Sequence, residues 1–245
     1  MPAKIVKRLR MFGGPNGSGK SSVLRNIDRR YQIGYYINAD EIENLLKTQG
    51  FLNLSNYGIL LEKGELEGFI RKSSFFQKTI STGLEISLQV EGNIVVANPN
   101  NTHSYEAALI SSFLREKLIS LEKSLSFETV MSHPSKLDIL KLANQKNYRN
   151  YLYFICTQSP ALNVERVQHR VAKGGHPVPE DKIISRYHRS LDLLSAAIKE
   201  TRRAFIFDNS KHIHELILEV FNGNEIVLHT DAVPKWVQIY VIDRL

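Results

Sequence analysis

The sequence has 245 residues and a net charge of +7, from 32 basic and 25 acidic side chains. Its hydrophobic content of 42% is enough for a sizeable core, and its single cysteine excludes an internal disulfide or a multi-cysteine metal site. No apolar stretch approaches the ~20 residues of a membrane span, and we expect no signal peptide, so a cytoplasmic protein is predicted. The length fits one large α/β domain, or one domain plus a modest appendage.

The positive charge has two interpretations. It can serve binding to nucleic acid, or it can line a pocket that handles polyphosphates. Because most of the basic residues are scattered along the chain, we favour the pocket. Cys156 lies in the apolar run 151–156, where we expect a buried and inert thiol.

The first motif follows a short predicted strand at 7–12 and precedes a helical pattern from residue 22. It matches the phosphate-loop pattern G-x-x-x-x-G-K-[ST], whose backbone N–H groups turn inward around an anion at a helix N-terminus. Lys20 is expected to reach the β- and γ-phosphates of a nucleoside triphosphate, and the Ser21 hydroxyl to ligate Mg²⁺. The alternative is a Gly-rich turn before an ordinary helix. The predicted nucleotide-binding residues are Gly14, Pro15, Asn16, Gly17, Ser18, Gly19, Lys20, Ser21 and Ser22.

Apolar runs and helical patterns then alternate along the chain. The further predicted strands of the core are 34–38, 125–129, 151–156 and 204–208. The predicted helices are 40–48, about 59–71, 104–123, 135–145, 163–172 and 181–200. Short apolar strands separated by helices predict an α/β fold with a doubly wound, mostly parallel, five-stranded sheet.

Two stretches depart from this alternation. Alternating apolar residues before Glu91-Gly92-Asn93 predict a hairpin over 80–97, and apolar runs at 225–229 and 236–241 predict a second one at the C-terminus. The expected organisation is a domain at 1–221, with an insertion at 50–103 and a lid at 163–190, and a hairpin appendage at 222–245.

In an open α/β sheet, ligands bind beyond the carboxyl ends of the strands. The sequence places Asp40, Glu128 with Thr129, and Asp208-Asn209-Ser210 at such ends. Asp40 is a candidate for the general base that orients an acceptor hydroxyl, with a helix N-cap as the alternative. Glu128 is a candidate for holding the metal or binding substrate, with a structural partner as the alternative.

Arginines recur on two predicted helices. Arg166 and Arg170 lie four residues apart, so a helix places them on one face, and Arg186 and Arg189 follow on the next helix. The stretch 174–179 between them is rich in Gly and Pro. Two helices joined in this way and carrying inward arginines are typical of a lid that closes over phosphates. Exposed arginines on solvated faces are the alternative.

Together these stretches resemble the zeta-toxin family of phosphate-loop kinases. The resemblance covers about residues 8–50 and 104–210. The matching segments are 14–21, 38–40, 126–129, 184–191 and 208–210, together with 166–170 and the stretch Gly174-Gly175-His176-Pro177-Val178-Pro179 that follows it. In that family a kinase-like sheet with a helical lid supports ATP-dependent phosphorylation of a UDP-linked amino sugar. That reaction poisons cell-wall synthesis, and a small antitoxin holds the enzyme off.

The resemblance implies ATP and Mg²⁺ as cofactors, and it implies a role for each matching residue. Asp40 would be the base, Lys20 and Ser21 the phosphate and metal ligands, and Asn209 would lie near the nucleotide base. Glu128 and Thr129 would meet the acceptor, and the lid arginines Arg166, Arg170, Arg186 and Arg189 the transferred phosphate. Residues 50–103 and the C-terminal hairpin are additional to the family's pattern, and they leave the acceptor open.

Two other classes of protein share some of these sequence features. A transporter-type ATPase has a similar loop, but the sequence contains no Leu-Ser-Gly-Gly-Gln-like signature and no four apolar residues leading into Asp-Glu. A nucleotide-dependent ATPase or binding module acting on nucleic acid or a protein partner would account for the charge and the insertion. We expect instead a small-molecule kinase, with an antitoxin as candidate partner and with neither a membrane nor nucleic acid as partner.

Overall fold

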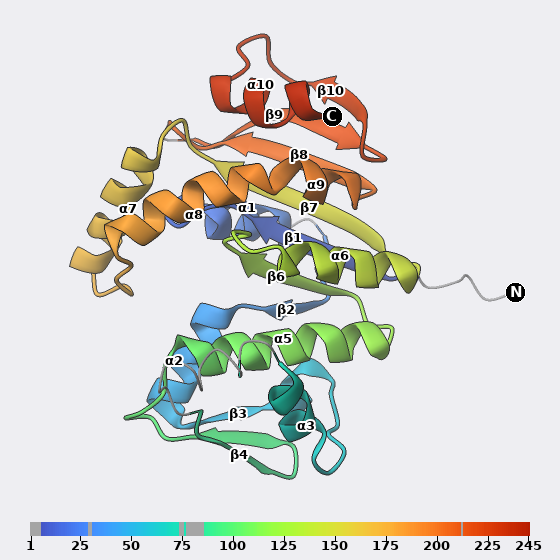
Figure 1. Cartoon of the computed structure of the whole chain (residues 1–245), viewed down its shortest axis with the longest axis vertical. Coiled ribbons are helices and arrows are strands. Elements are labelled where there is room, and N and C mark those ends of the chain that lie inside the picture. Colours follow the sequence, from blue (N-terminus) through green and yellow to red (C-terminus); the bar gives the residue numbers. More distant parts are fainter. Residues whose placement is uncertain (1–5, 29–30, 74–75, 77–85, 212) are drawn as a thin grey trace, which may run out of the picture. The chain divides into compact units, whose positions relative to one another are not determined.

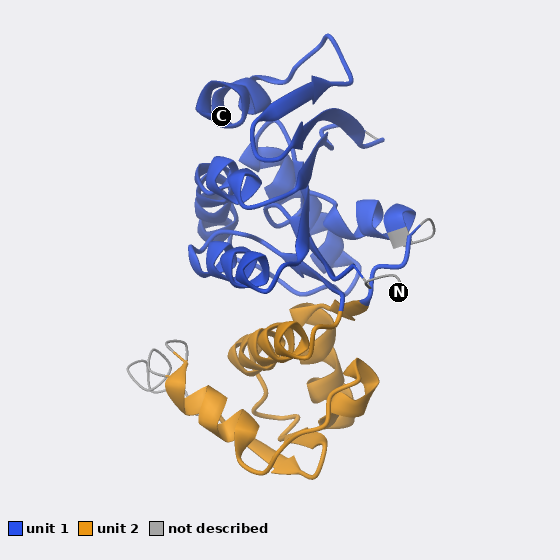
Figure 2. Cartoon of the chain, turned by 90° about the vertical axis from the view of Figure 1, so that its right-hand side faces the viewer, with its two compact units in different colours: residues 1–34, 124–245 blue, residues 35–123 orange. Residues whose placement is uncertain are grey.

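The computed structural model describes residues 6–28, 31–73, 76, 86–211 and 213–245. The chain divides into two compact units, shown in Figure 2: residues 1–34 with 124–245 form unit 1, and residues 35–123 form unit 2. Unit 1 is therefore discontinuous in sequence. No helix among the described residues is both long and apolar enough to cross a bilayer.

Unit 1 is built on a mostly parallel sheet. Its described strands are β1 (Arg8–Gly13), β6 (Leu125–Thr129), β7 (Arg149–Cys156), β8 (Arg203–Asp208), β9 (Glu215–Phe221) and β10 (Glu225–Leu228). Their order is β10-β9-β8-β7-β1-β6 (Figure 1). β1 pairs in parallel with both β6 and β7, and β7 pairs in parallel with β8, whereas β9 and β10 are antiparallel. The mostly parallel α/β sheet is confirmed, but the five strands predicted for it are too few, because the described residues of unit 1 alone contribute six strands.

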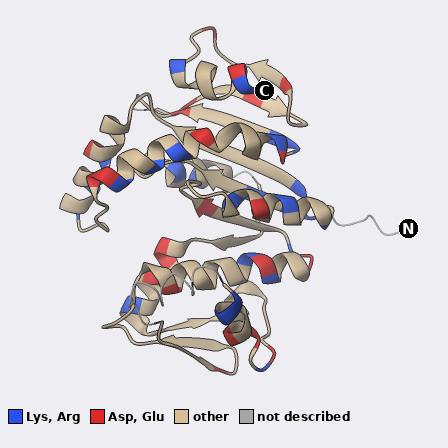
Figure 3. Cartoon of the chain, viewed as in Figure 1, with Lys and Arg blue, Asp and Glu red and all other residues tan. Residues whose placement is uncertain are grey.

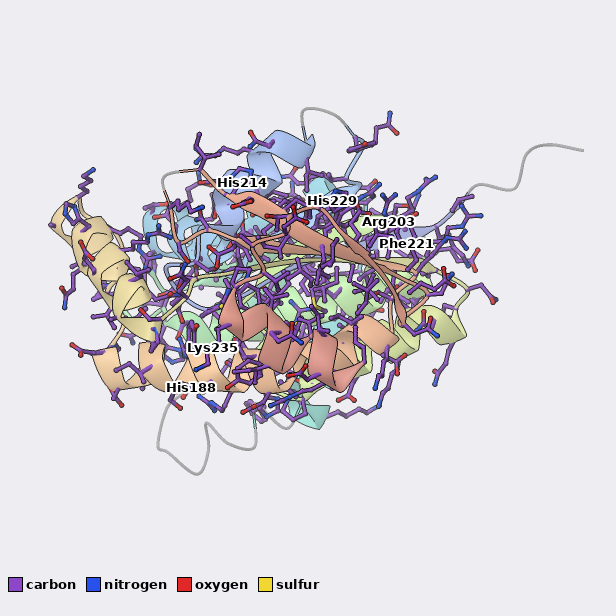
Figure 4. The ribbon with its side chains drawn as sticks, turned by 90° about the horizontal axis from the view of Figure 1, so that it is seen from above. His188, Arg203, His214, Phe221, His229 and Lys235 are labelled. Carbon is purple, nitrogen blue, oxygen red and sulfur yellow. The ribbon has the colours of Figure 1, made fainter. Side chains whose placement is uncertain are left out.

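Helices cover this sheet. α1 (Lys20–Asp28) packs on β1 and β7, and α6 (Ser135–Gln145) packs on β7. Figure 4 shows His188 and Lys235 on one side of the sheet, with Arg203 and Phe221 on the other. The remaining described helices are α7 (Pro160–Ala172), α8 (Glu180–Asp192), α9 (Leu194–Lys199), α10 (Lys235–Tyr240) and η2 (Ile242–Arg244). The helix predicted over 181–200 is interrupted at Leu193, which separates α8 from α9.

A C-terminal hairpin is present, but one of its two strands lies at a different position in the sequence from the predicted one. β9 pairs with β10, so the hairpin spans 215–228. Residues 236–241, predicted as a strand, instead form α10 and the residue after it. Trp236, Val237 and Val241 are buried, and the Trp236 ring lies 6.2 Å from that of Phe154 on β7. Burial of this helical face overrides the strand preference of aromatic and β-branched residues.

Unit 2 has its own small sheet and its own core. It contains β2 (Tyr35–Ile37), α2 (Ala39–Gln49), β3 (Phe51–Asn53), η1 (Leu54–Tyr57), α3 (Glu65–Lys72), β4 (Leu88–Glu91), β5 (Ile94–Ala97) and α5 (Ser104–Ser120). The antiparallel order is β3-β5-β4, and α2 packs against α5. The hairpin predicted over 80–97 is confirmed at 88–97, while residues 80–85 lie outside the described part of the chain.

Candidate active site

The phosphate loop joins β1 to α1, in the strand–loop–helix context that the motif requires. Gly17 and Gly19 have φ angles of 76° and 91°, in the left-handed region that favours glycine. A Cβ atom on Gly17 would lie 2.5 Å from the carbonyl oxygen of Asn163, and one on Gly19 would lie 2.2 Å from Nδ2 of Asn209. Both the backbone conformation and the surrounding atoms therefore require glycine here.

Lys20 is the first residue of α1, and its side chain lies over the loop. Its Nζ donates to the carbonyl oxygens of Gly14 at 2.9 Å and Pro15 at 3.0 Å. The first turn of α1 carries no acidic residue, so its positive dipole end is available to an anion. Behind it the Ser18 hydroxyl oxygen is buried and has no hydrogen-bond partner among the described residues. These features fit a bound polyphosphate.

Ser21 and Glu128 form a second pair of functional groups next to the loop. The Ser21 hydroxyl donates to Oε2 of Glu128 at 3.1 Å. Glu128 reaches this position because β6 pairs with β1 in a register that sets it opposite Phe12. A hydroxyl and a carboxylate are the hard oxygen ligands that Mg²⁺ takes in addition to phosphates and water. The structure thus brings together the two residues predicted to hold the metal.

A buried polar network holds the tip of the loop from behind. Asn163 on α7 donates from Nδ2 to the carbonyl oxygen of Asn16, across 147 residues of sequence, and its Oδ1 accepts from the Thr157 hydroxyl. Tyr187 on α8 donates to the carbonyl oxygen of Thr157 at 2.7 Å. Asn163 and Thr157 are completely buried. These residues are not among the predicted site residues, because nothing in their sequence spacing signals a contact with the loop.

Asn209 supports the loop from the end of β8. Its Nδ2 donates to the carbonyl oxygen of Ser18 at 2.8 Å, and its backbone N–H donates to the carbonyl oxygen of Cys156 at 2.8 Å. The structure therefore brings Asn209 to the nucleotide loop, as a residue that holds the loop in place. Its predicted position near the base of a nucleotide stays a prediction.

The predicted lid forms two helices that pack through Val164, Val167 and Ile183. Figure 3 shows acidic residues at the start of α8 and basic residues further along it. Arg186 on α8 points to the loop and makes a long hydrogen bond of 3.4 Å from Nη1 to Oδ1 of Asn16. Of the predicted lid arginines, it is the one that the structure connects to the phosphate loop.

The other three predicted lid arginines have different neighbours, and Arg189 makes a long contact of 3.4 Å to the carbonyl oxygen of Ser185 on its own helix. Arg170 donates to the carbonyl oxygen of His176 at 2.7 Å, and Arg166 makes a long contact of 3.5 Å to that of Lys211. With His169, Lys173, Gly174 and Gly175 they line an open hollow of about 460 Å³. This basic hollow, as we call it from here on, offers the guanidinium groups of Arg166 and Arg170 and the ammonium group of Lys173 to an anionic group.

Two further predicted residues have defined local surroundings. The Thr129 hydroxyl oxygen accepts from the backbone N–H of Met131 at 3.1 Å, so it supports the turn after β6. In unit 2, Asp40 is exposed in the first turn of α2, and Asn38 is the N-cap, accepting from the Asp40 N–H at 2.9 Å. The N-cap alternative for Asp40 is therefore wrong.

Cys156 lies behind the loop and does not take part in its chemistry. The thiol is fully buried, and burial raises its pKa to about 12. Burial also raises the pKa of the neighbouring Tyr187 hydroxyl. The thiol therefore stays protonated near neutral pH, which confirms the buried and inert cysteine.

No protein-family model and no curated protein matches the sequence. Among solved structures, the chain is similar to the AvrRxo1-ORF1:AvrRxo1-ORF2 complex with sulphate ions at 15% identity, and to the same complex with ATP at 14%, both with a TM-score of 0.54. Each match covers 91% of this chain and 61% of that chain, so this chain spans less than two thirds of its neighbour.

A third similar structure is that of the PezAT chromosomal toxin-antitoxin system of Streptococcus pneumoniae, at 16% identity and a TM-score of 0.46. That match covers 86% of this chain and 72% of that chain. The likeness to the AvrRxo1-ORF1:AvrRxo1-ORF2 structures shows a shared fold. Together with the mostly parallel sheet of unit 1, it confirms the predicted α/β fold.

Proposed function

We propose that the chain is an ATP- and Mg²⁺-dependent phosphotransferase of the zeta-toxin type, which transfers the γ-phosphate to a hydroxyl of a small molecule. One observation carries the proposal: Lys20 lies over the phosphate loop while Ser21, the next residue, is hydrogen-bonded to Glu128. Phosphoryl transfer requires positioned phosphates, a metal site and cations, and this arrangement supplies all three.

The donor side of the reaction uses the residues around the loop. Lys20 binds the β- and γ-phosphates, and the loop N–H groups orient them. Ser21 and Glu128 hold Mg²⁺, which when bound neutralises charge on the phosphate oxygens. Arg186, next to Asn16, stabilises the negative charge that develops on the transferred group.

The acceptor side requires a base, for which we propose Asp40. It takes the proton of the acceptor hydroxyl as that oxygen bonds to the γ-phosphorus, while the bond from this phosphorus to the β–γ bridging oxygen breaks and ADP leaves. Its support is that the Asp40 carboxylate is exposed and that Asn38 performs the capping of α2.

We further propose that the acceptor is itself anionic, with a UDP-amino sugar as the first candidate. Arg166 and Arg170 line the basic hollow together with His169 and Lys173, and this charge suits phosphate groups on the acceptor or the donor. Thr129 is a proposed contact to the acceptor. A protein partner in the role of an antitoxin is also proposed, since the similar AvrRxo1 structures contain a second protein.

The test is a transfer assay with labelled ATP, Mg²⁺, a panel of nucleotide sugars and cell extract. We expect a new phosphorylated small molecule that requires both Lys20 and Asp40. ATP hydrolysis with no transfer of label to any of the nucleotide sugars or to any compound of the cell extract would contradict the kinase proposal. Salt-sensitive retention of RNA or DNA in the same samples would favour the binding-module alternative instead.

A further inference from the structure

The C-terminal helix α10 reaches toward the phosphate loop through one side chain. Trp236, the only tryptophan of the sequence, is buried at 5% exposure. Its indole Nε1 donates to Oδ2 of Asp208 at 2.8 Å. Because the indole ring also packs near Phe154 on β7, the side chain is fixed both by its packing and by this hydrogen bond.

Asp208 is the last residue of β8, and its carboxylate is buried at 5% exposure. A buried carboxylate requires donors for both oxygens, because leaving one unpaired costs the desolvation of a charged group. Trp236 supplies the donor for Oδ2, and the backbone N–H of Ser210 supplies one for Oδ1 at 2.8 Å. The Asp208 side chain therefore connects α10 to the turn that follows β8.

This turn holds the phosphate loop. Asn209, between Asp208 and Ser210, donates from Nδ2 to the carbonyl oxygen of Ser18 at 2.8 Å. The Ser210 hydroxyl accepts from the backbone N–H of Gln158 at 2.8 Å, which fixes the turn to the end of β7. Two hydrogen bonds, joined through the backbone of residues 208–209, thus connect the indole of α10 to the backbone of the nucleotide loop.

We propose that Trp236 is a positioning residue for nucleotide binding: through Asp208 it sets the place of Asn209 and thereby the shape of the loop around Ser18. The inference rests on the proposed ATP site and deepens it. It also gives the C-terminal segment a role, since α10 carries the donor that fixes the turn after β8. The effect belongs to binding of the nucleotide, because Trp236 lies behind the loop and not at the reacting atoms.

The first test replaces Trp236 by phenylalanine, which keeps an aromatic ring and removes the indole donor. For Trp236→Phe we expect the KM for ATP to rise about tenfold, the size of one lost hydrogen bond to a charged group, with kcat changed less than about twofold. The matched control is Val237→Ala, which creates a cavity in the same helix and leaves the indole–carboxylate bond intact. Its KM for ATP is expected to stay within about twofold of the wild type, although its melting temperature falls.

A second measurement covers the case in which Trp236→Phe does not fold. The tryptophan fluorescence of the wild type arises from Trp236 alone, so we expect ADP binding to change this fluorescence. In Asn209→Ala we expect ADP to leave the fluorescence unchanged, although calorimetry still detects ADP binding. Equal KM values in Trp236→Phe and Val237→Ala would overturn the inference. So would fluorescence that stays constant as the wild type binds ADP. A wild type that binds no ADP at all would instead refute the proposed function.

Discussion

The phosphate loop and the basic hollow both offer positive charge to phosphates, but unit 1 builds them differently. The loop is backed by the completely buried side chains of Asn163 and Thr157, which hydrogen-bond to each other. In the hollow, Arg170, His169 and Lys173 are exposed, and Arg170 contacts a backbone carbonyl. The loop is therefore shaped before any ligand arrives, whereas the hollow presents long side chains that a ligand must order at an entropic cost.

The largest expected effect comes from the loop. Lys20→Ala removes the ammonium group that lies over the loop, and we expect kcat/KM to fall by about 1,000-fold, because a preorganised charge at the transferred phosphate is lost. Steady-state kinetics with labelled ATP measures this change. The matched control is Lys173→Ala in the basic hollow, for which a loss below about tenfold is expected. Similar losses in both variants would remove the distinction between the two regions.

The next effect tests whether a complete phosphate loop is enough for transfer. Asp40→Asn keeps the size of the side chain and removes its basicity, so we expect transfer to slow by about 100-fold or more. ATP affinity, measured by calorimetry, should remain within about twofold. Undiminished transfer in this variant would show that Asp40 is not the base.

The arginines divide between the two regions and sharpen the comparison. Arg186→Ala removes the cation beside Asn16, and we expect kcat to fall about 10- to 100-fold. Arg170→Ala removes an exposed cation of the basic hollow. We expect mainly a several-fold rise in the KM for the anionic acceptor substrate. If the two variants exchanged these kinetic signatures, the assignment of Arg186 to the donor side would be wrong.

The smallest effect concerns the rigidity of the loop. Asn163→Ala leaves the Thr157 hydroxyl and the Asn16 carbonyl without their partner, and we expect the free energy of unfolding to fall by about 1–3 kcal/mol. Urea unfolding measures it. Gln168→Ala, at an exposed position of the same helix, serves as control and should change stability by less than about 0.5 kcal/mol. Equal stabilities would mean that the buried network does not hold the loop.

Much of the fold was predictable because its signals are local. The helix at 135–145 and the strand at 125–129 were predicted with the bounds that α6 and β6 have. β9 was not recognised as a strand, because a short apolar run such as 216–218 has no distinctive period. Residues 236–241 form a helix although their composition favours a strand, because Trp236, Val237 and Val241 are buried together on one face, which depends on tertiary packing.

The candidate site was likewise predictable where its residues belong to a local motif or to the end of a strand. The glycines, Lys20 and Ser21 belong to one motif, and Glu128 follows from the rule that parallel strands end at one edge of the sheet. Asn163, Thr157 and Trp236 could not be found in this way. Their contacts with the loop and its support join residues that are distant in sequence, and a single sequence contains no pattern for such pairs.

The discontinuity of unit 1 has a consequence for the growing chain on the ribosome. β1 is synthesised before unit 2, yet both of its partner strands, β6 and β7, come after it. At a synthesis rate of about 5–20 residues per second, β6 follows β1 only after roughly 6–20 s. Asn209, which hydrogen-bonds to the loop, is synthesised later still. Unit 2 is contiguous and is complete by then. The hydrogen bond that Asn209 makes to the loop therefore forms only after all of unit 2 and strands β6, β7 and β8 have been synthesised.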